Sequence, residues 1–188
     1  MTTAAWAIHL PTADQTCIRV SLRPRDLRDP WPFTLALSEL QGLGAVGEGR
    51  FRALGSGHGE PLLASQELTW RGCPVHLETL RGRDGSREAA LALPSWDELC
   101  DQSDAVEDDF WDLVDAFAAA VGAGHGAIVD GEPLAPVPPP AETPAAWQRL
   151  LDRHLALLVP EPIAAALSGC HAVQYRDLPR SGLAVLLR

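Results

Sequence analysis

Apolar and polar positions alternate along the first half of the chain, and this alternation predicts strands. Residues 16–22 show it most clearly, because apolar side chains at every second position are typical of a half-buried strand. Further strands are predicted at residues 4–10, 50–52, 61–70, 74–81 and 87–93. The pair Asp84-Gly85 favours a tight hairpin turn between the last two. The pattern at residues 33–41 fits a short helix and a strand equally well.

The clearest helix is predicted at residues 103–121. Apolar residues recur there at spacings of three and four, and acids recur at the same spacings half a turn away. At about 100° per residue, the two sets fall on opposite sides of a helix. The apolar stripe consists of Val106, Phe110, Leu113, Val114, Phe117 and Val121, and the acidic stripe of Asp101, Asp104, Asp108, Asp112 and Asp115. Trp111 falls on the flank of the acidic stripe.

The last third of the chain predicts two helices followed by two strands. A proline-rich loop near residues 133–144 precedes a helix with Thr143 as its N-cap and Pro144 at its first position. This helix is predicted to run to about Val159, and a second, shorter one to reach Leu167. Strands are predicted at residues 171–176 and 183–188, and a short strand at residues 127–129 precedes the proline-rich loop.

Strand runs followed by helices are typical of an α+β fold. We therefore expect one domain over residues 1–188, with a mostly antiparallel sheet and two main helices packed on one face. A glycine-rich loop is expected near residues 42–59.

The net charge of −10 is concentrated in one segment. Residues 88–148 hold thirteen acids and no basic residue, whereas the segments before and after carry only +1 and +2. No Arg lies closer in sequence to the acidic stripe than Arg87 and Arg149. A field of this kind repels nucleic acid and attracts basic partners.

Composition excludes several classes of function. All 15 basic residues are Arg, so no Walker-A lysine or Schiff-base lysine is present. No apolar run approaches the roughly 20 residues that span a bilayer, and the first residues lack a charged leader with an apolar segment. We therefore expect a cytoplasmic protein without a membrane partner. The four cysteines are far apart and are expected to be reduced.

Three groups of residues suggest chemistry, and each has a simpler interpretation. Residues 42–47 fit the glycine spacing of a dinucleotide site, but the sequence that follows does not start a helix, so a loop is favoured. The acidic stripe contains metal-binding residue types, yet a straight row on a helix favours a solvated face. His58 and His125 stand between glycines and lack the spacing of a metal site. No cofactor or metal is therefore expected.

The second half of the chain resembles a known family. A helix leads to the segment Ala123-Gly124-His125-Gly126-Ala127-Ile128, then to a proline-bearing loop, a Trp-containing helix and a final apolar strand after Leu178-Pro179-Arg180-Ser181-Gly182. This order resembles the C-terminal half of the immunity protein 52 family of bacterial polymorphic toxin systems. The resemblance implies an α+β protein without catalysis that binds and blocks a cognate toxin, commonly a nuclease.

Two hypotheses follow, and both leave the oligomeric state open. The first is a non-enzymatic, cytoplasmic binding protein of the immunity type that neutralises a basic partner through its acidic helix. Its partner-binding residues would be Asp104, Asp108, Trp111, Asp112 and Asp115, with Trp111 as the aromatic anchor. The alternative is a small enzyme or a biosynthetic accessory protein that uses His58, His125 or the acidic row.

Overall fold

The structure is a computed structural model, and it describes residues 18–25, 33–47, 52–53, 62–81, 87–101, 106–130, 143–168 and 174–187. Its strands are β1 (Ile18–Pro24), β2 (Arg52–Ala53), β3 (Leu62–Trp70), β4 (Cys73–Arg81), β5 (Arg87–Leu93), β6 (Ala123–Asp130), β7 (Ala156–Pro160), β8 (Gln174–Leu178) and β9 (Leu183–Leu187). Its helices are α1 (Phe33–Gly42), α2 (Trp96–Cys100), α3 (Val106–Ala120), α4 (Pro144–Leu151) and α5 (Glu161–Ser168).

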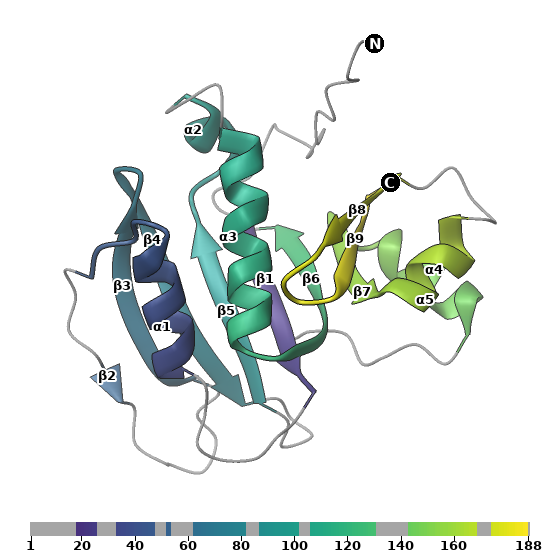
Figure 1. Cartoon of the computed structure of the whole chain (residues 1–188), viewed down its shortest axis with the longest axis horizontal. Coiled ribbons are helices and arrows are strands. Elements are labelled where there is room, and N and C mark those ends of the chain that lie inside the picture. The colour runs from purple at the N-terminus through teal and green to yellow at the C-terminus, as the bar shows by residue number, and fades with distance from the viewer. Residues whose placement is uncertain are drawn as a thin grey trace.

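The described strands form one nine-stranded sheet in the order β2-β3-β4-β5-β1-β6-β7-β9-β8 (Figure 1). Every pairing between neighbouring strands is antiparallel. The α+β class with an antiparallel sheet is therefore confirmed. Residues 33–41, which the sequence left open, belong to helix α1. The predicted strand at residues 4–10 and the Asp84-Gly85 turn lie outside the described residues.

From β2 to β5, strands that follow one another in the sequence pair side by side in the sheet. Between β3 and β4 the chain turns over only two residues, Arg71 and Gly72, because Trp70 pairs directly with Cys73. Both turn residues have positive φ, 52° and 81°. A two-residue turn with positive φ at both positions matches the twist of the strands that it joins. This turn also carries the Arg71 side chain toward α3, as described below.

The sheet buries apolar residues on both of its faces near β6, β7 and β9. Along β7, Ala156 and Leu158 join the core that includes α3, whereas Leu157 and Val159 join a second core that includes Trp147 of α4. Because successive side chains of a strand point to opposite faces, the two cores lie on opposite sides of the sheet. The prediction that the two main helices share one face is therefore not confirmed, since α3 and α4 pack on different faces.

The predicted helix from Thr143 to about Val159 begins correctly but is too long. Thr143 accepts a hydrogen bond at its side chain from the backbone N–H of Ala146, 3.2 Å away, and thereby caps α4. The helix ends at Leu151, and residues 156–160 form β7 instead. A strand that is buried on both faces has no alternation, so its apolar run at 155–159 was indistinguishable from a continuing helix.

The sequence analysis did not predict α2. Its N-cap is Ser95, whose side chain accepts from the backbone N–H of Glu98, while the Glu98 carboxylate accepts from the backbone N–H of Ser95. This reciprocal pair is a capping box, and a Ser followed three residues later by a Glu is its sequence signature. The Trp96 ring then packs edge-on against Phe110, with centroids 5.2 Å apart, and so joins α2 to α3.

Candidate binding face at helix α3 and the β8–β9 hairpin

Helix α3 lies on the sheet with its apolar stripe inward, as the sequence predicts. Phe110, Val114 and Phe117 have no exposed surface. On the other side of the helix, Asp108 and Asp112 are exposed to solvent. Asp104, the first acid proposed for partner binding, lies outside the described residues.

Trp111 differs from its predicted setting on the outer surface. Only 2% of it is exposed, and its ring packs edge-on against Phe110 with centroids 4.9 Å apart. The β8–β9 hairpin, which is formed by the end of the chain, lies beside this flank of α3 (Figure 1). From β8, Arg176 places its guanidinium carbon 5.9 Å from the centroid of the Trp111 ring. The expectation of a freely exposed aromatic anchor is therefore corrected.

Asp115 is also buried rather than outward-facing, with 4% of its surface exposed. Its Oδ2 accepts a hydrogen bond from the backbone N–H of Arg180 at 3.0 Å. Its Oδ1 accepts from the backbone N–H and the hydroxyl of Ser181, at 2.9 and 2.8 Å. These donors belong to the turn between β8 and β9. Asp115 therefore holds the turn against α3, and its carboxylate is not part of the outer surface.

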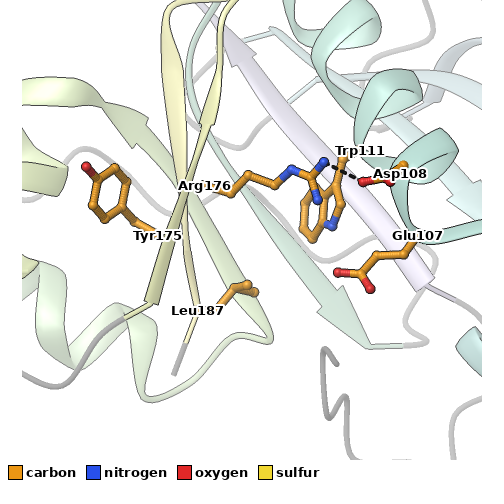
Figure 2. A pocket seen from close by; sticks show the side chains of 6 residues that line it. All are labelled: Glu107, Asp108, Trp111, Tyr175, Arg176 and Leu187. Carbon is orange, nitrogen blue, oxygen red and sulfur yellow. Dashed lines mark hydrogen bonds and ion pairs between the residues drawn. The ribbon is translucent and has the colours of Figure 1, made fainter. Parts of the chain in front are cut away.

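Two acids of α3 form ion pairs with arginines that are remote in sequence. Arg176 binds Asp108 with 2.8 Å between Nη2 and Oδ1, although the two residues are 68 positions apart (Figure 2). Arg71, from the β3–β4 turn, forms an ion pair with Asp109. Folding thus partly neutralises the acids of α3. Asp112 remains exposed one turn after Asp108.

A cavity of about 310 Å³ opens between α3 and the β8–β9 hairpin. Its lining combines acidic, basic and apolar groups from both sides: Glu107, Asp108, Trp111, Tyr175, Arg176 and Leu187. Figure 2 shows the Arg176 side chain crossing from β8 toward Trp111, and the Glu107 carboxylate reaching from the helix into the space on the same side as Leu187. Tyr175 extends to the other side of β8 and is 48% exposed, so it belongs to the rim.

The Glu107 carboxylate of this cavity has a perturbed pKa. Burial is the main cause and raises its pKa above the ordinary value, because a partly desolvated carboxylate disfavours its charged form. The nearby Arg176 lowers the pKa, Asp108 raises it, and a hydrogen bond from the Trp111 side chain lowers it. The net shift is upward. A further positive charge in the cavity would favour the ionised form of Glu107.

The histidines of the alternative hypothesis are not brought to the acidic helix. His125 is buried, and its ring packs edge-on against Trp147 of α4, with centroids 6.3 Å apart. His58 lies outside the described residues. Burial lowers the pKa of the half-buried His154, and Arg153 adds to this effect. Within the part of the chain that the structure describes, no three His, Cys, Asp or Glu residues form a group that could hold a metal ion.

Other sequence features have structural roles. Gly42 ends α1 rather than opening a helix, which agrees with the loop interpretation of residues 42–47. Cys73 is buried and Cys100 is exposed, and both are free thiols. Burial raises the pKa of both thiols, with nearby acids adding to the effect. Of the helices in the described ranges, none has the length and apolar character to cross a membrane.

Sequence reasoning missed Glu107, Tyr175, Arg176 and Leu187 as members of a common site. Glu107 was counted among the acids but lies off the regular stripe. The other three come from the end of the chain, and no local pattern indicates that β8 and β9 fold beside α3.

No model of a known family matches the chain, and no curated protein matches it. One solved structure that resembles it is that of the Pseudomonas aeruginosa T6SS protein PA0821, with a TM-score of 0.45 and 12% sequence identity. The alignment covers 92% of this chain and 64% of that protein, so the chain spans less than two thirds of its length. Membership of the immunity protein 52 family is not confirmed.

Proposed function

We propose that this chain is a non-enzymatic binding protein of the immunity type, which neutralises a basic protein partner such as a nuclease toxin. The binding surface is the α3 face, which we define as Asp104, Asp108, Asp112 and the cavity beside them. Asp104 belongs to it on sequence grounds alone. The observation that carries the proposal is that Asp108 and Asp112 stay exposed on a helix within a chain of net charge −10.

The two buried residues of the predicted site receive different roles in this proposal. Trp111 forms part of the cavity wall, and Asp115 fixes the β8–β9 turn that supplies the opposite wall. The exposed acids would act by electrostatic attraction, which raises the rate of encounter with a basic protein. We do not propose catalysis, because His125 packs against Trp147 of α4, away from the acids of α3.

Affinity capture from the source cells tests the proposal. The tagged chain is used as bait beside a variant with Asp112→Arg, and the control bait carries Glu161→Arg. Both substitutions change the charge by the same amount at exposed helical positions. The proposal expects a basic protein that the wild type and the control retain in equal molar amounts and that Asp112→Arg loses. Retention by all three baits, or capture of nucleic acid in place of a protein, would contradict it.

A further inference from the structure

The cavity between α3 and the β8–β9 hairpin is formed by the fold itself. Three hydrogen bonds from Arg180 and Ser181 to Asp115 fix the hairpin at one end of the contact. The ion pair between Arg176 and Asp108 connects the two walls at the cavity. The position of the cavity therefore does not depend on a ligand, and a preformed site loses little entropy when a ligand binds.

The size of the cavity suits a single side chain rather than a large cofactor. About 310 Å³ lies at the lower limit of the roughly 300–1,000 Å³ that is usual for ligand pockets. Trp111 and Leu187 supply apolar surface, and Glu107 supplies a carboxylate on the same side as Leu187 (Figure 2). A ligand that combines an apolar stem with one polar end group would match both kinds of wall.

The charge of the lining decides whether a positive or a negative end group of the ligand binds better. Glu107 and Asp108 contribute two negative charges and Arg176 one positive charge, and the positive charge already pairs with Asp108. Glu107 is half-buried, so a neutral ligand that displaced its remaining water would leave the carboxylate with only the Trp111 hydrogen bond and the attraction of Arg176 to offset its desolvation. An anionic ligand would meet two carboxylates. A cation is the ligand that restores the balance.

We infer that this cavity receives the side chain of an arginine from a basic partner, with its guanidinium on Glu107 and its stem against Leu187 and Trp111. Arginine fits better than lysine, because the planar guanidinium binds a carboxylate through two parallel hydrogen bonds and also stacks on aromatic rings. Arg176 already places its guanidinium over the Trp111 ring and donates a hydrogen bond to Asp108 within the chain. The inference rests on the proposed function, of which it specifies the central contact.

A capped tripeptide, acetyl-Gly-Arg-Gly-amide, provides the test on the full chain. Its binding is followed by NMR through the indole N–H resonance of Trp111, in the wild type and in Glu107→Gln. The matched control is Glu161→Gln, which removes an exposed acid far from α3 along the chain. The same peptide with citrulline in place of arginine keeps the size and shape but loses the charge.

With the arginine peptide we expect a saturable shift of the Trp111 indole resonance. Binding should weaken about fivefold or more in Glu107→Gln and stay unchanged in Glu161→Gln. The citrulline peptide should bind at least about fivefold more weakly, because it cannot neutralise Glu107. Equal binding of the two peptides, an unaffected Glu107→Gln variant, or the absence of a saturable shift would each overturn the inference.

The result for the proposed function is read separately, from Asp112→Arg in the capture experiment, since Asp112 does not line the cavity. If Asp112→Arg loses the partner while the arginine peptide fails to bind, the proposed function is supported and the arginine pocket is refuted. If the peptide binds but Asp112→Arg keeps the partner, the pocket is supported as a cation site and the exposed acids of α3 are not the main contact.

Discussion

Oδ1 of Asp115 accepts two hydrogen bonds from Ser181, one from the backbone N–H at 2.9 Å and one from the hydroxyl at 2.8 Å. The two residues are 66 positions apart, so this contact joins the middle of α3 to the turn at the end of the chain. It gives one acid of the predicted stripe a structural role. The same contact sets the position of the wall from which Arg176 reaches Asp108.

Asp115→Ala should destabilise the protein by about 2–4 kcal/mol. The change removes hydrogen bonds to a charged acceptor and leaves backbone N–H groups of the turn without their partner. The measurement is the free energy of unfolding in urea. Asp112→Ala is the matched control on the same helix, and we expect it to stay within about 0.5 kcal/mol of the wild type because Asp112 is exposed. Similar values for the two variants would refute the structural role of Asp115.

Phe117→Ala should cost about 3–5 kcal/mol of folding free energy. Phe117 has no exposed surface and lies in the core between α3 and the sheet. Removing its ring leaves a cavity that the surrounding helix and strands cannot fill completely. Urea unfolding monitored by circular dichroism gives the value. A loss below about 1 kcal/mol would mean that this side of α3 is not packed.

Periodicity predicted the two opposite sides of α3, because that helix has one buried and one exposed side. It gave the inward position of Phe110 and Phe117 and the exposure of Asp108 and Asp112 correctly. It failed for Trp111 and Asp115, which lie on the flank that the β8–β9 hairpin covers. A hydrophobic pattern within one helix holds no information about a second element that packs beside it.

The same limitation explains the error after Leu151. Residues 155–159 are all apolar, and β7 is buried on both faces, so neither the strand period nor the helix period is visible there. The pairing of Arg176 with Asp108 was equally inaccessible, because it depends on the order of strands in the sheet. By contrast, the capping box at Ser95 and Glu98 was readable from the sequence, and it would have revealed α2.

Glu107 should make the stability of the protein depend on pH in a particular direction. Its pKa in the folded chain is raised above the ordinary value of 4.5, mainly by burial. The folded state therefore binds this proton more tightly than the unfolded state, and stability falls as the pH rises from about 4.5 through the raised pKa. The groups that face Glu107 are Arg176 and Trp111, which lower the pKa, and Asp108, which raises it.

In Glu107→Gln the side chain does not titrate, so its contribution to the pH dependence of stability is absent. The melting temperature of the variant should therefore exceed that of the wild type at neutral pH, and the difference should shrink as the pH falls below 4.5. Calorimetry of both proteins across this range, in the same buffers, provides the comparison. A difference that grows toward acid pH would show that the sign of the shift is wrong.

Asp112→Arg should slow the association of the chain with its basic partner. Asp112 is exposed on α3, so the substitution is expected to leave the fold intact while reversing a charge of the α3 face. At low salt we expect the association rate constant to fall about two- to fivefold, because long-range attraction accelerates encounter. At high salt the difference should nearly vanish, since exposed charges are then screened beyond a few ångströms.

Glu161→Arg separates a local effect from a change in net charge. It alters the total charge equally, at an exposed position on α5, which packs on the other face of the sheet. Stopped-flow or surface-based kinetics at low and high salt should therefore show a clearly smaller effect for Glu161→Arg than for Asp112→Arg. If both variants slow association equally, the partner responds to the total charge of −10 and not to α3. If neither does, the acidic stripe is a solvated surface, and the binding face must be sought elsewhere on the molecule.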